Sequence, residues 1–394
     1  MKAGREADFK LFSISNLDES FQFNPLIGGT PEEIAERVFN SFEFDNPYYR
    51  SVQFEIFGQI LRAFQAAGVI PTFRRLHDAI TDPDRLLNLL VGKNADLESW
   101  LDEFIKLDRN ERSKRTSGLT AALSHFAFGK PAALYNTETP GIDLDLALAS
   151  GKIIYFQLPV LLAPFLGRAT GKLALQALQS AVAGRHRSSP SEEPKFFSIF
   201  LDDFTEYLYP GFVSILNKTR SANMGVVFAH QALGDIKTLG DPIANSILTN
   251  SNLKIFMRGN DPESAEYYSR VIGTKGAMKF TERAKRGIVG QDYTGDVSAR
   301  EVEEFIVHPN RFKSNLGVGE AVVVVPHASG SKCVQMKFKM FDDLKPNELQ
   351  IVEKAESLGL AKVKSEKNER KQNAMFNDSN SVPNYTVGGM CDPK

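Results

Sequence analysis

The sequence has few cysteines and no apolar run long enough to cross a membrane. Its two cysteines, Cys333 and Cys391, form neither a disulfide framework nor a metal-ligand pair, and its 6 histidines show no ligand spacing. The longest apolar runs have the length of a strand, and the segment that begins at Met1 is polar and charged, unlike a secretory leader. We therefore expect a soluble chain in a reducing cytoplasm, without a structural metal.

The sequence also lacks an excess of charge of either sign. Its 47 basic and 48 acidic residues leave a net charge of −1, which excludes a global basic surface for nucleic acid. Any contact with DNA would have to be local. With 394 residues, of which 42% are hydrophobic, the chain can bury a large core, and we expect two domains and a tail.

What is present is a pair of apolar runs that end in polar side chains. Residues 196–201 lead into Asp202 and Asp203, and residues 224–229 lead into His230 and Gln231. Ligands bind at the carboxyl ends of strands in open α/β sheets, and carboxylates there can hold Mg²⁺ and polarise a water. An acidic strand end is also an ordinary surface turn, so the pattern alone leaves both interpretations open.

Helical and strand patterns divide the chain into parts. Thr30, Pro31 and Glu33 combine an N-cap, a first-turn proline and a capping-box glutamate, and helical apolar spacing continues to residue 128. Continuous apolar strands separated by helices follow, which is typical of a parallel sheet covered on both faces. Low apolar content predicts disorder at 362–394. The predicted strands are 9–14, 152–158, 195–201, 224–229 and 253–258, the later helices 166–184, 205–220 and 261–272, and two edge strands 319–325 and 334–340.

Several of these segments resemble a known family. Asp202 and Asp203, the KTRS sequence at residues 218–221 and Gln231 after the next strand are similar to the TraG/TraD-type coupling-protein ATPases of conjugative and type IV secretion systems. These are RecA-like motors related to FtsK. Further similar segments, in the family's order, are AGR at 3–5, FNPL at 23–26, and residues 151–159 and 250–273.

The resemblance implies an α/β fold with a RecA-like P-loop NTPase core, in which a mostly parallel sheet has helices on both faces and carries an inserted all-α domain. Residues 1–29 are expected to form the N-terminal part of the core, and residues 30–128 the all-helical inserted domain. Residues 129–345 are expected to complete the core with a Walker B-like strand, and residues 346–394 to form a C-terminal helix and a disordered tail.

One motif of that family is missing. A phosphate-binding loop has the pattern G-x-x-x-x-G-K-[ST], and no such string occurs in the sequence. The closest string, GRATGKL at 167–173, has three intervening residues and lies in a helical pattern, so we do not interpret it as a phosphate loop. In the family this loop precedes the AGR sequence. We therefore expect a chain that starts after its phosphate-binding loop and its membrane anchor.

The resemblance also implies roles for four residues, with ATP and Mg²⁺ as cofactors. Asp202 is expected to hold Mg²⁺, and Asp203 stands where the family has a water-activating glutamate that is one methylene longer. Gln231 is expected to sense the γ-phosphate or orient the water, or else to be an ordinary polar strand end. Arg220 is either an arginine that reaches a neighbouring subunit's nucleotide or a surface cation.

Two functions follow from the resemblance. The first is the motor portion of a coupling protein, a homo-hexamer at the cytoplasmic side of the bacterial inner membrane that couples ATP hydrolysis to delivery of relaxase-bound DNA from the relaxosome to secretion-channel ATPases. The second is a truncated, non-hydrolysing module that binds the same partners. Basic clusters at 185–187 and 275–286 are either DNA contacts or solvated loops. The missing phosphate loop leaves open whether this chain is an enzyme.

Overall fold

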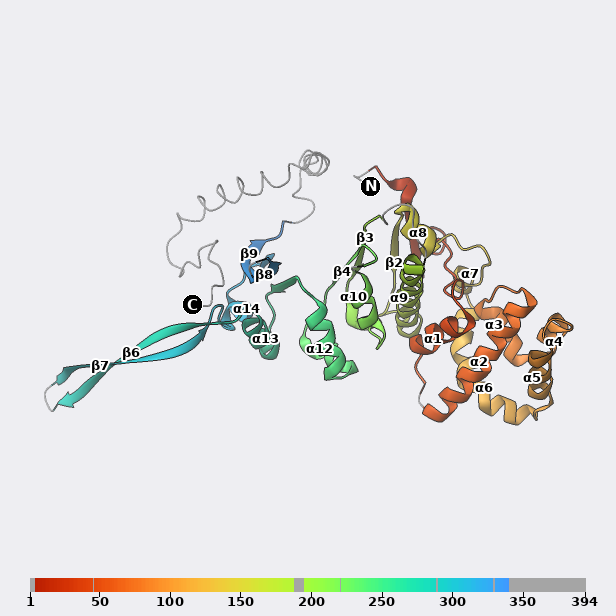
Figure 1. The fold of residues 1–394 in the computed structure, drawn as a ribbon, viewed down its shortest axis with the longest axis horizontal. Helices are drawn as coiled ribbons and strands as arrows, with labels where there is room; N and C mark the ends of the chain where they lie inside the picture. Colours follow the sequence, from red (N-terminus) through yellow and green to blue (C-terminus); the bar gives the residue numbers. More distant parts are fainter. Residues whose placement is uncertain are drawn as a thin grey trace. The chain divides into compact units, whose positions relative to one another are not determined.

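The computed structural model describes residues 4–44, 46–187, 195–219, 221–287, 290–328 and 330–339. The chain divides into two compact units (Figure 1). The first unit contains the chain up to His230 together with residues 236–247, and the second contains residues 231–235 and the chain from Leu248 onward.

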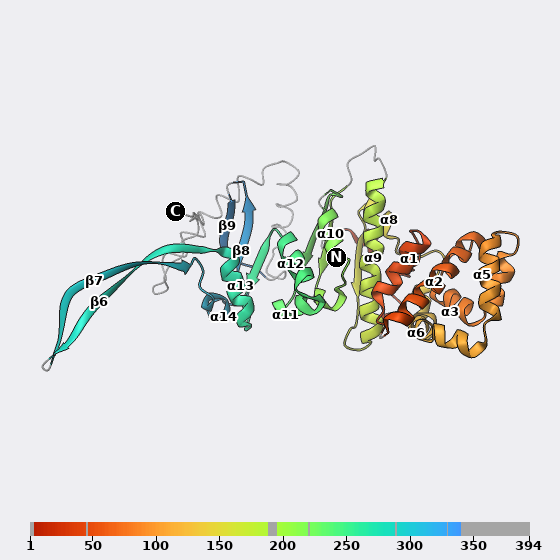
Figure 2. The same cartoon turned by 60° about the horizontal axis from the view of Figure 1, so that its bottom comes forward.

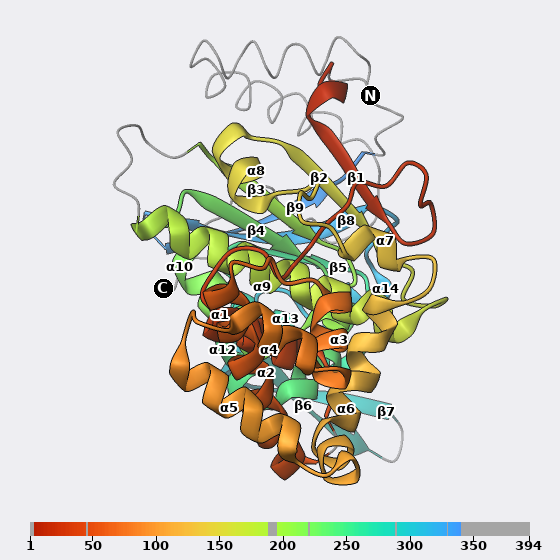
Figure 3. The ribbon, with the colours of Figure 1, turned by 90° about the vertical axis from the view of Figure 1, so that its right-hand side faces the viewer.

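The first unit contains two small parallel sheets. β1 (Phe9–Ser13) pairs with β2 (Ile153–Gln157), and β3 (Phe197–Leu201) pairs with β4 (Met224–Phe228), as Figure 3 shows from the side of the helices. Each strand lies where an apolar run predicts one. The sheets are nevertheless smaller than predicted, with two strands each.

The prediction that both sheet faces are covered is not confirmed at the β3–β4 pair. Phe200 and Val227 are register partners on these strands, and they are 74% and 52% exposed. An apolar pair directly opposite on one face normally lies against a covering layer, because its burial is favourable. Within this unit, that face of the pair stays open to solvent.

Helix α9 (Pro164–Arg187) is the longest helix of the first unit and organises its packing. In Figures 1 and 2 it lies between the β3–β4 pair and the block of helices formed by residues 31–127. It contacts α1 (Pro31–Ser41) and α8 (Leu144–Ser150) in that unit. The helix covers the predicted range 166–184 and continues three residues further.

The helical block begins where the sequence predicts it. Thr30 caps the first helix with its hydroxyl, which accepts from the amide of Glu33, while the Glu33 side chain accepts from the amide of Thr30. Asparagine, threonine and aspartate side chains cap later helices in the same way. The helices are α1 (Pro31–Ser41), α2 (Pro47–Ala67), α3 (Phe73–Thr81), α4 (Asp84–Leu90), α5 (Ala95–Lys106) and α6 (Arg109–Ala127), followed by the short α7 (Ala132–Tyr135).

The helical block and the β1–β2 sheet share one hydrophobic core. Phe12 of β1, Phe57 of α2, Leu119 of α6 and Leu173 of α9 belong to a single buried cluster, and each is fully buried. Burial of each such side chain contributes about 1.5–3 kcal/mol to stability. The division into an inserted helical domain and an NTPase core stays a prediction, since this core runs through both.

The single helix predicted at residues 205–220 is wrong, because the segment is broken. A short 3-10 helix η2 (Phe204–Tyr207) is followed by Pro210 and Gly211, and helix α10 (Phe212–Thr219) begins only after them. Proline lacks an amide hydrogen and glycine has the highest conformational freedom, so the pair interrupts a continuing helix. Short helices that the sequence did not predict follow β4: α11 (Leu233–Ile236), η3 (Lys237–Leu239) and α12 (Asp241–Asn250).

The second unit is built on a three-stranded antiparallel sheet. The strands β5 (Lys254–Met257), β8 (Glu320–His327) and β9 (Gly330–Lys337) lie in the order β5-β8-β9, and α13 (Pro262–Ile272) and α14 (Asn310–Ser314) pack with them. The predicted strand and helix at 253–258 and 261–272 are confirmed. The prediction of two edge strands is right for β9 but wrong for β8, whose apolar residues are buried between its two neighbours.

A long hairpin in the second unit was not predicted. β6 (Thr274–Gly287) and β7 (Gly290–Phe305) pair antiparallel over nearly their whole length. Their sequences are mostly polar and charged, without the apolar alternation that marks a half-buried strand. None of the helices that the structure describes combines the length and the apolar content needed to cross a bilayer.

Candidate functional site at the end of β3

The carboxyl ends of β3 and β4 are joined by backbone hydrogen bonds just before the acidic pair. The amide of Ala229 donates to the carbonyl of Leu201 at 2.9 Å, and the amide of Phe204 donates to the carbonyl of Ala229 at 3.1 Å. Asp202 and Asp203 therefore occupy a turn that both strands hold, and both residues are exposed. The predicted position of the two carboxylates at a strand end is confirmed by this geometry.

Asp203 adopts a backbone conformation that is uncommon for a residue other than glycine. Its φ is 46° and its ψ is 44°, which places it in the left-handed helical region. Its amide also donates to Asp202 Oδ1 at 3.1 Å. The left-handed region costs an L-residue about 1–2 kcal/mol, and aspartate tolerates it better than most residues. Such strain is often found at functional sites.

The 3-10 helix after the acidic pair is anchored by aromatic packing. Phe204 is fully buried, and its ring centroid lies 4.6 Å from that of Phe212 and 4.8 Å from that of Phe228. On the other side, the ring of Tyr207 lies so close to α9 that a Cβ atom on Gly171 would stand 2.2 Å from Tyr207 Cδ1. Glycine is the only residue that allows this approach.

An ion pair fixes the same turn to α9. Arg168 Nε donates to Glu206 Oε2 at 2.6 Å. The residues Arg168 and Gly171 both belong to the GRATGKL string, which lies entirely inside α9. The string therefore serves helix packing, and the decision not to interpret it as a phosphate loop is confirmed. The sequence gives no signal that would have assigned this role to Tyr207 or Glu206.

Comparisons with known proteins agree with the resemblance seen in the sequence. Residues 197–314 match the family model described as "TraM recognition site of TraD and TraG". A curated protein, "Type 4 coupling protein DotL" of Legionella pneumophila, is 28% identical over 211 residues. The fold is similar to the bacterial conjugative coupling protein TrwBΔN70, with a TM-score of 0.61 and 17% identity over 86% of this chain and 75% of that one.

The chain is related to the TraG/TraD-type coupling proteins. The match with DotL spans 49% of this chain and only 26% of DotL. Two further solved structures have a similar fold: the plasmid coupling protein TrwB in complex with the non-hydrolysable GTP analogue GDPNP (TM-score 0.59, 16% identity, 86% of this chain and 76% of that one) and VirB4 of Thermoanaerobacter pseudethanolicus (TM-score 0.54, 11% identity, 86% and 78%). The predicted RecA-like α/β class is thereby supported.

Tyr207 lies beside the acidic residues of the turn. Burial raises the pKa of the Tyr207 hydroxyl, and the negative charges of Glu206, Asp203 and Asp202 raise this pKa further. Tyr155, on β2, adds a smaller contribution. The hydroxyl therefore stays protonated near neutral pH and can donate a hydrogen bond to a carboxylate or a phosphate oxygen.

The donor set of the turn fits Mg²⁺ held together with phosphate. Asp202 and Asp203 supply carboxylate oxygens, the ligands that Mg²⁺ prefers, and Mg²⁺ is commonly bound by one or two carboxylates plus waters and substrate phosphates. Among the residues that the structure describes, no group of three or more His, Cys, Asp or Glu side chains could hold a metal ion. The turn therefore does not fit a structural metal with an all-protein ligand set.

Gln231 and Arg220 are the other two predicted site residues. His230 is half-buried at the end of β4, whereas Gln231 is exposed and is grouped with the second unit. Arg220 lies outside the described residues. The roles predicted for Gln231 and Arg220 stay predictions of the sequence analysis.

The first of the two basic clusters does not form a loop. Arg185 lies in α9, where its guanidinium donates to the carbonyls of Leu148 at 2.5 Å, Ala222 at 3.1 Å and Lys195 at 3.3 Å. Burial lowers its pKa. The expectation that residue 185 belongs to a loop is wrong, because the residue lies in α9. Its guanidinium joins three chain segments.

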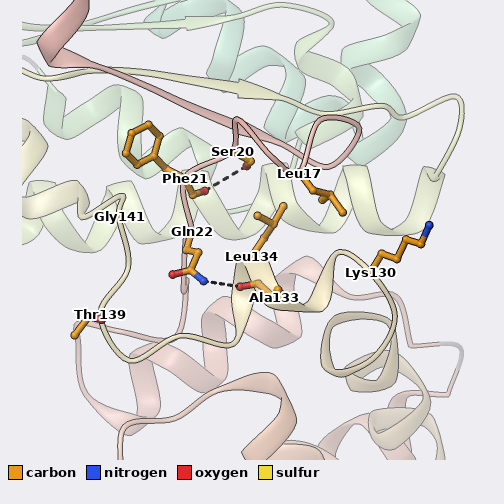
Figure 4. A pocket seen from close by; sticks show the side chains of 9 residues that line it. All are labelled: Leu17, Ser20, Phe21, Gln22, Lys130, Ala133, Leu134, Thr139 and Gly141. Atoms are coloured by element: carbon orange, nitrogen blue, oxygen red, sulfur yellow. Dashed lines mark hydrogen bonds between the residues drawn. The ribbon is translucent and has the colours of Figure 1, made fainter.

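A separate groove of the first unit does not involve the predicted site residues. It has a volume of about 450 Å³, and its lining includes the apolar side chains of Leu17, Phe21 and Leu134 (Figure 4). Among its lining residues, Gln22 Nε2 donates to the carbonyl of Ala133 at 3.1 Å. Lys130 stands at the rim. The acidic turn at the end of β3, and not this groove, is the candidate site for nucleotide chemistry.

Proposed function

We propose that this chain is the motor portion of a type IV coupling protein, which couples ATP hydrolysis to delivery of a DNA–protein substrate to a secretion channel. The observation that carries the proposal is the exposed Asp202–Asp203 turn at the joined carboxyl ends of β3 and β4. Two features support it: the fold is shared with TrwB, which has been solved with a GTP analogue, and ligands bind at this edge of such sheets.

In this proposal the two carboxylates have different tasks. Asp202 would hold Mg²⁺, which would neutralise charge on the phosphates, and Asp203 would orient the attacking water. The left-handed backbone of Asp203 and its bond to Asp202 Oδ1 fix the direction in which each side chain leaves the turn. The Tyr207 hydroxyl, which its raised pKa keeps protonated, is available as a hydrogen-bond donor beside this charged site.

The phosphates themselves need a cradle of amide groups that this sequence does not contain in the usual form. No G-x-x-x-x-G-K-[ST] string occurs in it. A motor role for this polypeptide therefore requires phosphate-binding groups of another form. The role of Gln231 as a γ-phosphate sensor and that of Arg220 as an arginine acting on a neighbour's nucleotide belong to the same proposal.

The partners follow from the matched family. The family model over residues 197–314 is named for recognition of TraM, so we propose a relaxosome protein as one partner. We further propose a homo-hexamer that binds relaxase-bound DNA, cooperates with the ATPases of the secretion channel and works at the cytoplasmic side of the bacterial inner membrane.

The test is Mg²⁺-dependent binding of ATP by the purified chain, measured by calorimetry, together with phosphate release. The Asp202→Asn and Asp203→Ala variants are compared with Asp96→Asn, which removes an exposed carboxylate on α5. We expect the first two to lose Mg²⁺-dependent binding or turnover and the third to behave as wild type. Absence of binding in all four proteins would overturn the motor role for this polypeptide and leave the non-hydrolysing module as its function.

A further inference from the structure

The β6–β7 hairpin of the second unit presents two chemically different faces. Its register places Met278 opposite Glu301 and Phe280 opposite Ala299, so these four side chains lie on one face. The alternate residues, among them Lys275, lie on the other face. The described base of the hairpin, residues 274–280 and 299–305, is sufficient to distinguish the faces.

One face combines large apolar side chains with carboxylates; we call it the acidic apolar face and define it by Gly276, Met278, Phe280, Glu301 and Glu303. Met278 is 58% exposed and Phe280 is 68% exposed. Glu303 and Glu301 flank them, and Glu303 accepts a hydrogen bond from the Thr274 hydroxyl at 3.3 Å. Within the described residues of this face there is no basic side chain.

The opposite face is cationic. Lys275, Lys279 and Arg300 lie on it with a single carboxylate, Glu304, within the described base. Lys279 Nζ is 3.3 Å from Glu304 Oε1. The predicted basic cluster at 275–286 therefore begins on the face that does not carry Met278 and Phe280. A ligand complementary to the acidic apolar face therefore combines apolar and basic groups.

A two-stranded hairpin is marginally stable in water by itself, and exposed aromatic and thioether side chains gain free energy when a partner covers them. We propose that the acidic apolar face of the β6–β7 hairpin docks a basic, apolar segment of a partner protein. The aliphatic stems of lysine or arginine cover Met278 and Phe280, while their charged ends reach Glu301 and Glu303.

Nucleic acid fits this face poorly, since its phosphates meet two glutamates and no cation. The inference goes beyond the nucleotide chemistry proposed for the acidic turn and does not depend on it. The hairpin lies within residues 197–314, the range that matches the family model named for recognition of TraM. Partner binding at this face is therefore compatible with a recognition role for the matched region.

The test uses the full chain and two labelled amphipathic peptides with the same leucine face, one with lysine and one with glutamate on its polar face. Binding is measured by fluorescence anisotropy. We expect the lysine peptide to bind, and Phe280→Ser to weaken it by at least about tenfold. A Glu301→Lys, Glu303→Lys variant keeps both apolar residues and is expected to exchange the preference toward the glutamate peptide. Lys279→Gln, on the cationic face, is the matched control and is expected to bind as wild type.

Three results would overturn the proposal. The first is equal binding of both peptides by the wild-type chain. The second is competition by a DNA duplex that depends on Glu301 and Phe280, which would assign the face to nucleic acid. The third is a concentration-dependent oligomer, seen by sedimentation, that Phe280→Ser abolishes, which would assign the face to a second copy of this chain. Asp202→Asn is included as a further control. It is expected to affect nucleotide binding and to leave peptide binding unchanged, so failure of the nucleotide proposal can be distinguished from failure of this one.

Discussion

The ring of Tyr207 occupies the space in which a side chain on Gly171 would lie, at 2.2 Å from an ideal Cβ to Tyr207 Cδ1. This contact joins α9 to the turn that carries the two aspartates. The base of an aromatic ring cannot move aside as the end of a flexible side chain can. The position of the acidic turn therefore depends on the absence of one methyl group.

Gly171→Ala is expected to destabilise the chain by about 1–3 kcal/mol, because the methyl group displaces the Tyr207 ring. Alanine also has a higher helix propensity than glycine, by about 1 kcal/mol, but this gain is smaller than the largest expected cost of the clash. Urea unfolding measures the difference. Gly234→Ala is the control, since a Cβ there meets no atom within 4 Å. Equal stability of the two variants would contradict the contact.

Asp203→Gly is expected to relieve backbone strain, and Asp203→Ala to increase it by about 1 kcal/mol. Asn223→Gly is the matched control, because Asn223 is the other non-glycine residue with positive φ in the described part of the chain. We expect both glycine variants to be at least as stable as wild type, while only the Asp203 variant affects Mg²⁺-dependent nucleotide binding. Thermal unfolding and calorimetry check both parts. A less stable Asp203→Gly variant would be inconsistent with strain at this residue.

Tyr135 predicts a loss of stability at alkaline pH. Its hydroxyl is fully buried and lies 2.7 Å from Thr170 Oγ1, and burial raises its pKa above the usual value of about 10. The folded state therefore keeps a proton that the unfolded state loses, so this stabilising contribution is complete below about pH 10 and is lost as the pH rises further.

Tyr135→Phe is expected to flatten the fall in the free energy of unfolding above about pH 10, at a cost of roughly 1 kcal/mol at neutral pH for the lost hydrogen bond. Unfolding by urea at several pH values between neutral and alkaline measures the slope. Tyr48→Phe serves as the control, because Tyr48 is 71% exposed. Identical slopes for wild type and Tyr135→Phe would show that another group sets the alkaline limit.

Arg185→Met is expected to cost about 2 kcal/mol, because a charged donor shared by the carbonyls of Leu148, Ala222 and Lys195 is removed while the aliphatic stem remains. Arg168→Met breaks an exposed ion pair with Glu206 and is expected to cost at most about 1 kcal/mol. Comparison of the two variants in urea unfolding separates the structural arginine from the surface one. A larger effect at Arg168 would reverse this assignment.

Sequence patterns were sufficient for elements whose signal is local. The strand that ends at Leu201 was found because an apolar run stops abruptly at two charges, and α1 was found because Thr30 and Glu33 form a capping box. The break at Pro210 and Gly211 was missed because the flanking apolar spacing stays helical. Where a proline–glycine pair interrupts a helical apolar pattern, the pair is the stronger indication of where the helix ends.

Features that depend on contacts distant in sequence were not predictable. The β6–β7 hairpin has no apolar alternation, since both of its faces are exposed in the described base. The role of Gly171 follows from Tyr207, which lies in another element. The antiparallel position of β5 beside β8 depends on a strand that lies far along the chain from it. These relationships exist only after the chain has folded.

The common core of the helical block and the β1–β2 sheet has a thermodynamic consequence. Phe12, Phe57 and Leu173 come from a strand and two helices, yet they lie in one buried cluster. Removal of the helices between residues 31 and 127 would therefore remove part of the core to which Phe12 and Leu173 belong. The helical block and the sheet beneath it are therefore expected to unfold in a single cooperative transition, and neither is an excisable module.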